Sequence, residues 1–296
     1  MMFKRIALFL LINFLVVATI SVVLSFLNVK PYLTAYGLDL QALMVFCLIW
    51  GMVGAFISLA LSRKMAKWLM RVHLISSESE HAHLYETVAH LAKRANLPTV
   101  PEVGIFDSPQ LNAFATGPTK KRSLVAVSTA LLREMDPNEL EAILAHEITH
   151  ISNGDMVTMT LIQGIVNAFV MFLARVLAYA ISMTGRSNNS RRPSYMSYYL
   201  FTILFEVVFM VFGAMVIGTF SRMREYRADQ GGATLTRKES MIGALEKLKK
   251  VKATSVSKKS ALSALMISMP TKGGLLNLFS THPPLDKRIE RLRGIN

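Results

Sequence analysis

Four long apolar runs divide an otherwise polar chain. They cover residues 6–27, 42–61, 156–183 and 199–220. Each is long enough for an α-helix that crosses the hydrocarbon core of a bilayer, which needs ~20 residues. The first run exceeds the ~7–15 apolar residues of a typical signal peptide, so we expect an uncleaved span there. The pattern therefore predicts a mostly α-helical membrane protein with four hydrophobic helices.

The polar segment between the second and third runs contains short helical and strand-like patterns, as expected for an α+β domain. Residues 81–95 carry leucine and valine at helical spacing. Strand-like segments at 102–106, 112–116 and 123–127 follow, with turn sequences between them. We expect a soluble domain in this part of the chain.

A second helix is predicted at the end of this segment. Asp136 is a suitable N-cap, Pro137 fits the first helical position, and Glu139 completes a capping box. The helix should continue to about Ile151 and end at Asn153-Gly154. After the fourth apolar run, residues 222–296 look helical and basic, with a loop rich in serine and lysine at 254–263.

These boundaries give four parts. Residues 1–62 hold two N-terminal spans, 63–155 form the first part of a polar domain, 156–221 form an apolar helical hairpin, and 222–296 form the second part of the polar domain. Basic residues follow the second run at once, whereas the loop between the first two runs has only Lys30. The positive-inside rule therefore places both polar parts in the cytoplasm.

The pattern leaves open whether the hairpin crosses the membrane. Two full spans would place its loop outside the cell, yet the loop carries Arg186, Arg191 and Arg192, which the positive-inside rule disfavours there. Either the charges around the first two spans determine the orientation, or the hairpin does not fully cross. Arg175 and Glu206 lie at equal distances from the centre of the loop, so they reach the same depth in a hairpin. They either form a pair inside the bundle or both lie near water.

Composition and charge narrow the function. Hydrophobic residues make up 52% of the 296, and the mean hydropathy is +0.39. The net charge of +14 could suggest nucleic acid, but residues 222–296 alone hold 16 basic and 6 acidic side chains, beside an apolar run. That position suits anionic lipid, and we see no nucleic-acid-binding motif. The single cysteine, Cys47, excludes disulfides within the chain and cysteine metal clusters.

The predicted second helix carries the segment His-Glu-Ile-Thr-His. His146 and His150 are four residues apart, so they share a helix face and can bind one Zn²⁺ ion. Glu147 lies beside them and can take a proton from water. A catalytic site needs a third ligand, and residue 156, the nearest familiar position, is methionine.

Glu225 and Asp229 are candidates for completing the site. They also lie four residues apart, so Glu225 could bind the metal while Asp229 accepts the N–H of a histidine ligand. By spacing alone, a solvated pair that compensates the neighbouring arginines is equally acceptable.

With these motifs, the chain resembles the HtpX family of bacterial membrane metalloproteases, relatives of the CAAX prenyl endopeptidases. The resemblance lies in the two N-terminal spans and in residues 112–117, 145–150, 153–156, 224–229 and 281–285. It differs from the usual family pattern at Tyr226 and Arg227, which should point away from the ligand face.

The resemblance implies a cytoplasmic α+β domain of the gluzincin type with one zinc ion per subunit. His146, His150 and Glu225 would be ligands, Glu147 the general base and Asp229 the partner of a ligand. It further suggests that Asn112 holds the substrate backbone beside an edge strand and that His282 donates to the oxyanion. Asn112 could instead be a simple turn residue, and His282 could only shape the chain before Pro283.

The expected activity is hydrolysis of peptide bonds in cytoplasmic or membrane-proximal segments of proteins. The resemblance implies a multi-pass protein of the bacterial inner membrane that acts in stress-related quality control, with protein substrates and the lipid bilayer as partners and no nucleic acid. The rival hypothesis is a non-catalytic scaffold with a structural zinc, which would not need Glu147. A transporter is weakly supported because no inverted repeat is visible.

Overall fold

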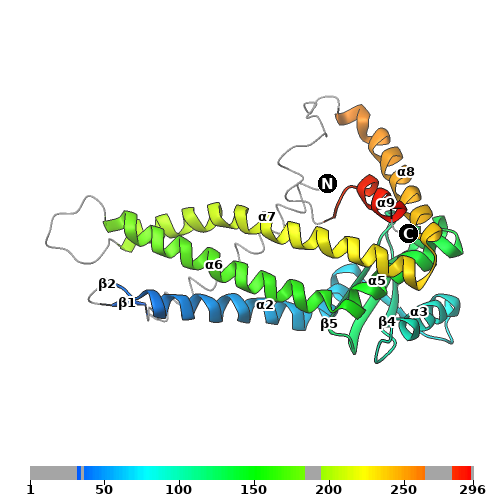
Figure 1. The fold of residues 1–296 in the computed structure, drawn as a ribbon, viewed down its shortest axis with the longest axis horizontal. Helices are drawn as coiled ribbons and strands as arrows, with labels where there is room; N and C mark the ends of the chain where they lie inside the picture. The colour runs from blue at the N-terminus through cyan, green and yellow to red at the C-terminus, as the bar shows by residue number, and fades with distance from the viewer. Residues whose placement is uncertain (1–31, 35–36, 184–194, 264–281, 295–296) are drawn as a thin grey trace. The chain divides into compact units, whose positions relative to one another are not determined.

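The computed structural model describes residues 32–34, 37–183, 195–263 and 282–294 (Figure 1). The chain divides into two compact units. One includes Met159–Thr219 and the chain up to Ile57; the other includes Ser58–Thr158 and most of the chain after Phe220. The first predicted span and the loop of the hairpin lie outside the described residues.

Three helices of the described chain are long and apolar enough to cross a membrane. They are α2 (Leu40–Met70), α6 (Asp155–Met183) and α7 (Tyr195–Leu235). In the first unit they run side by side (Figure 1), and many of their large apolar side chains are exposed. Outward apolar side chains are what a bilayer accommodates and water does not, so the fold is that of a membrane protein.

Small residues allow the helices of this unit to pack closely. A Cβ atom at Gly51 of α2 would lie 2.6 Å from the carbonyl oxygen of Gly164 and 2.8 Å from the amide nitrogen of Ala168, both in α6. At Gly213 of α7 it would lie 2.8 Å from Val166 of α6. Such contacts between backbones are typical of helix association in lipid.

Arg175 of α6 and Glu206 of α7 form a buried ion pair. The Nη1 atom of Arg175 lies 2.7 Å from Oε1 of Glu206 and also donates to the carbonyl of Met171 at 3.1 Å. Both side chains are almost fully buried. The predicted pairing is therefore confirmed, and the alternative that both charges lie near water is wrong.

The second unit contains a four-stranded sheet. Its strands are β3 (His73–Ile75), β4 (Glu102–Phe106), β5 (Ala113–Thr119) and β6 (Arg122–Ser128), in the order β3-β4-β6-β5. The pair β4 and β6 is parallel and the other pairs are antiparallel. Strand β5 is thus an edge strand. A separate two-stranded sheet in the other unit joins β1 (Leu33–Thr34) and β2 (Gly37–Leu38).

Helices of this unit pack against the sheet or against one another (Figure 1). The sheet is contacted by α3 (Ala82–Arg94), the short α4 (Thr129–Glu134) and α5 (Pro137–Asn153), whereas α8 (Lys238–Ser263) packs against α5 and α9 (Leu285–Arg293) packs against α8. Val88, Val125, Leu144 and Ile148 belong to the apolar core between them. Burial of one such side chain contributes roughly 1.5–3 kcal/mol.

The ends of α5 are formed as predicted. The Asp136 carboxylate accepts the amides of Asn138 and Glu139 at 2.9 and 3.0 Å, and Glu139 accepts the amide of Asp136, which completes the capping box. Gly154 ends the helix with φ of 70°, a left-handed conformation that glycine adopts without strain.

One predicted segment was wrong, and one helix is longer than the apolar run that it contains. Helix α7 continues past Phe220 without a break to Leu235 and includes Glu225 and Asp229. Helix α8 continues through the segment 254–263, which we had expected to be a loop. Serine lowers helix propensity only by tenths of a kcal/mol, and this segment contains neither glycine nor proline to stop a helix.

Candidate metal centre

The motif histidines lie on one buried face of α5. Their Nε2 atoms are 3.2 Å apart, and the rings meet edge to face at 87°. His146 and His150 are both buried, whereas Glu147 between them is half-buried. One helix therefore presents two imidazole nitrogens to a common point, as the four-residue spacing predicts.

Helix α7 brings Glu225 to the same point. Its Oε1 atom is 3.4 Å from Nε2 of His150, and its Oε2 atom is 3.6 Å from Nε2 of His146. The three residues offer ligand atoms that all lie within 4.8 Å of one another. Glu225 is nearly fully buried, so the reading of it as a solvated surface residue is wrong.

Two glycines let α7 approach α5. A Cβ at Gly231 would meet the side chain of Thr149, and one at Gly232 would lie 3.1 Å from the amide nitrogen of His146. Contacts of this length leave no room for a larger residue without movement of the backbone. The sequence Gly231-Gly232, two residues after Asp229, therefore helps to set the distance between the two halves of the site.

Two carboxylates hold the outer nitrogens of the histidines. Asp229 Oδ1 lies 3.0 Å from Nδ1 of His146, and Asp155 Oδ2 lies 2.6 Å from Nδ1 of His150. Sequence reasoning named Asp229 but missed Asp155, the first residue of α6. Its position five residues after His150, just past the helix-ending glycine, could have indicated it. With Nδ1–H donated to a carboxylate, each ring turns its Nε2 lone pair inwards.

Arg288 of α9 is a further residue that sequence reasoning missed. Its Nε donates to Asp229 Oδ2 at 2.7 Å and its Nη2 donates to Asp229 Oδ1. Its Nη1 lies 3.7 Å from Oε2 of Glu225. The arginine is buried, so this double contact gives Asp229 a fixed orientation toward His146.

The cluster fits a divalent metal ion. Two nitrogens bound tetrahedrally to zinc at ~2.0–2.1 Å lie about 3.4 Å apart, close to the 3.2 Å between the Nε2 atoms. No hydrogen bond reaches the buried Oε1 of Glu225 from the described part of the chain. Two histidines and one glutamate are also a common ligand set of catalytic zinc sites, which keep a fourth position open.

The electrostatics of the cluster favour a cation. Burial lowers the pKa of His146, but its hydrogen bonds to Asp229 and Glu225 outweigh this effect and raise the pKa to about 9. The same carboxylates that attract a proton to this ring also attract a metal ion, which would displace the proton.

The remaining predicted residues lie in different places. Nδ1 of His282 is 2.7 Å from Oε2 of Glu225, although 64% of the His282 side chain is exposed. Asn112 lies directly before the edge strand β5 and is exposed; its carbonyl accepts the amide of Ser128 at 2.9 Å. The structure thus brings His282 to the metal cluster and places Asn112 at the sheet edge.

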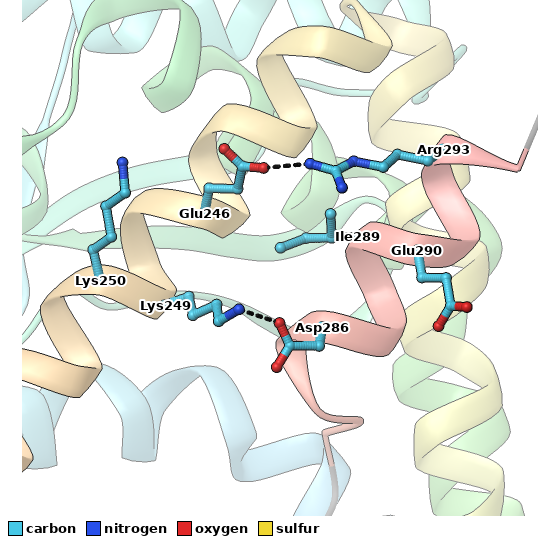
Figure 2. A pocket seen from close by; sticks show the side chains of 7 residues that line it. All are labelled: Glu246, Lys249, Lys250, Asp286, Ile289, Glu290 and Arg293. Carbon is cyan, nitrogen blue, oxygen red and sulfur yellow. Dashed lines mark hydrogen bonds and ion pairs between the residues drawn. The ribbon is translucent and has the colours of Figure 1, made fainter.

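A hollow lies between α8 and α9 (Figure 2). Its volume is about 560 Å³. Its walls carry charges of both signs, and two ion pairs cross it, Lys249 with Asp286 and Glu246 with Arg293. Because its charges largely compensate each other, this hollow shows no chemistry of the kind found at the metal cluster.

Comparisons with known proteins agree with the site. The model of peptidase family M48 matches residues 78–296. A protease HtpX homolog from Methylacidiphilum infernorum is 46% identical over 300 residues, covering 99% of each chain, and one from Bacillus subtilis is 46% identical over 302 residues, covering 98% of this chain and 99% of the other. Protease HtpX from Cellvibrio japonicus is 45% identical over 98% of each chain.

A solved structure shares the fold. The crystal structure of Ste24p from S. mikatae matches with a TM-score of 0.60 at 19% identity, over 98% of this chain and 65% of that chain. Apolar helices joined to a buried histidine–glutamate cluster define a membrane-bound metalloprotease. The chain belongs to peptidase family M48, and its full-length similarity is to HtpX proteases, which confirms the resemblance seen in the sequence.

Proposed function

We propose that the protein is a zinc endopeptidase whose metal is held by His146, His150 and Glu225. The convergence of the two Nε2 atoms and the Glu225 carboxylate is the observation that carries this proposal. The site draws on both polar parts of the chain, 63–155 and 222–296, which together would form the protease domain. Asp229 and Asp155 keep the rings in the ligating tautomer.

The proposed hydrolysis depends on Glu147, which lies beside the proposed ligands. A bound zinc ion supplies a Lewis acid that polarises the scissile carbonyl and makes water acidic near pH 7. Glu147 takes the proton of the attacking water and passes it to the leaving nitrogen. General acid–base transfer of this kind contributes typically 10²–10⁴-fold to a rate. Glu147 is half-buried on α5, between the two histidines in sequence, which suits a group that must meet both substrate and water.

His282 is the proposed donor to the oxyanion of the tetrahedral intermediate. Its contact with Glu225, at the start of the segment before α9, supports this role. An exposed ring can turn toward a substrate carbonyl, where a positioned donor has its largest effect in the transition state.

The substrate would bind as an extended strand beside β5. That strand pairs with β6 on one side only, within the described sheet. An edge strand can accept a peptide through main-chain hydrogen bonds, and Asn112 at its start could hold the substrate backbone. The exposed position of Asn112 supports this role.

The site adjoins helices of the membrane type, which suggests its substrates. Asp155, the partner of His150, is the first residue of α6, and Glu225 belongs to the same continuous helix as the apolar part of α7. We expect cleavage of cytoplasmic or membrane-proximal segments, including those of misfolded membrane proteins, by a multi-pass protein of the bacterial inner membrane. Preferential cleavage of membrane-protein loops over soluble casein would support this expectation; equal cleavage without detergent or lipid would contradict it.

Glu147→Gln separates the peptidase from a zinc-locked scaffold. The amide preserves size but cannot take a proton, so the purified variant should keep one zinc ion per chain and lose peptide hydrolysis by 10²-fold or more. Metal analysis and cleavage of a fluorogenic peptide measure both properties. Glu141→Gln, on the same helix but outside the motif, is the control and should cleave normally. Undiminished hydrolysis by Glu147→Gln would exclude the mechanism.

A further inference from the structure

An apolar stripe continues along α2 beyond the residues that can lie in the hydrocarbon core. The apolar run 42–61 already spans about 30 Å, the thickness of that core. Helix α2 continues to Met70 through Arg63, Lys64 and Lys67, which are too costly to bury in lipid chains. The last turns of α2 therefore lie outside the hydrocarbon core.

These last turns have two distinct faces. Arg63 and Lys67 face the sheet, where they pair with Glu102 of β4 at 3.1 and 2.6 Å. With successive residues about 100° apart, Met65, Trp68 and Leu69 fall on the opposite face, in line with Leu61. We call these four residues the α2 stripe. Their exposed fractions are 45% for Leu61, 44% for Met65, 74% for Trp68 and 62% for Leu69.

The chemistry of the stripe suits the headgroup layer of a bilayer. Tryptophan prefers this layer because its ring is apolar and its N–H is polar. The side chains of a helix lean toward its N-terminus, which directs the Trp68 ring back toward the apolar run. The exposed Lys64 lies along the edge of the stripe nearest Trp68, and the exposed Arg71 directly follows the end of the helix. Both cations can meet lipid phosphates.

We propose that the α2 stripe lies in the headgroup layer of an anionic bilayer and anchors the second unit, which contains the metal cluster, to the membrane surface. The occupant is lipid, because the stripe continues the apolar face of the same helix and is bordered by cations. This inference concerns the membrane surface of the unit and does not depend on which residues bind zinc.

The two tryptophans of the chain allow a direct test. Trp50→Phe leaves Trp68 as the only tryptophan, and Trp68→Phe leaves Trp50 as a matched control inside the apolar run. Each full-length variant is placed in two kinds of nanodisc, one of phosphatidylglycerol and one of phosphatidylcholine, with bromine near the glycerol or near the chain ends of the lipid. Trp68 should be quenched most by the shallow bromines, and Trp50 most by the deeper ones.

The result can contradict the proposal in two ways. Quenching of Trp68 by aqueous iodide, with no response to brominated lipid, would place the stripe in water. Resistance to both quenchers would mean that protein covers it, either a second copy or another partner.

Lys64→Gln combined with Arg71→Gln should reduce the shallow quenching in phosphatidylglycerol discs to the level found in phosphatidylcholine discs. An unchanged difference between the lipids would exclude the proposed role of these cations.

Discussion

Each histidine of the cluster has one nitrogen directed inward and one held by a carboxylate. His146 is held by Asp229 and His150 by Asp155, so the two proposed ligands have separate supports. The spacing within 146–150 predicts the two histidines, because they repeat after one helical turn. The spacing within 225–229 left Glu225 and Asp229 undecided, and the resemblance to the HtpX family selected them. Asp155 and Arg288 could not be predicted in the same way, since their roles arise from a chain reversal at Gly154 and from the packing of α9.

Asp155→Asn should weaken metal binding. The amide cannot accept as strongly from Nδ1 of His150, so the ring loses its fixed tautomer and orientation. Loss of such a partner typically costs 10–100-fold in metal affinity. Competition with a zinc chelator measures this change.

Asp286→Asn is the matched control. Asp286 lies on α9, where it pairs with Lys249, so the variant should bind zinc as tightly as the unaltered protein. Equal zinc affinity of the Asp155→Asn variant would show that Asp155 does not support the ligand.

At the scale of elements, α7 has two roles in one helix. Gly213 and Glu206 in its apolar part contact α6 in the first unit, and its last turns carry Glu225 and Asp229 in the second unit. The hydrophobic pattern indicated the apolar run 199–220 and the segment with Glu225 and Asp229 as separate features. Periodicity alone does not show whether two neighbouring helical segments form one continuous helix. It also missed β3, which has three residues, too few to show alternation.

Gly232→Val tests the contact between α7 and α5. A Cβ at this position lies 3.1 Å from the amide nitrogen of His146, so the branched side chain should force the helices apart. We expect a loss of roughly 1–3 kcal/mol of stability together with weaker zinc binding. Thermal unfolding and chelator competition provide the two readings.

Gly243→Ala in α8 provides the comparison for this change. The nearest atom to its new Cβ is Glu139 Oε1, at 4.0 Å, so there is room for a methyl group. Alanine should be tolerated or stabilise the helix by about 0.5–1 kcal/mol. A Gly232→Val protein that behaves like Gly243→Ala would show that close approach at Gly232 is not required.

The ion pair between α6 and α7 can be tested by exchanging its charges. Arg175→Glu and Glu206→Arg each place two like charges in a buried site, so each should lower the unfolding temperature in detergent. The double exchange restores opposite charges and should recover part of the loss. A double variant no more stable than the worse single variant would show that the pair does not hold these helices together.

At the scale of the whole molecule, a metal centre joins segments far apart in the sequence. His146 and Glu225 are separated along the chain by α6 and by the apolar part of α7. The sequence motif predicts only one side of the site; the fold supplies the other, because the chain leaves α5 through α6 and returns through α7. The family comparison independently supports a metalloprotease of this type.

The zinc content of two variants, measured side by side, tests this account most directly. Glu225→Ala removes the proposed ligand supplied by α7, whereas Glu147→Gln changes only the proposed base. We predict about one zinc ion per chain in Glu147→Gln and in the unaltered protein, and a loss of most of the zinc in Glu225→Ala at equal protein concentration. One zinc ion per chain in a folded Glu225→Ala protein would contradict the account, because the third ligand would then come from another residue.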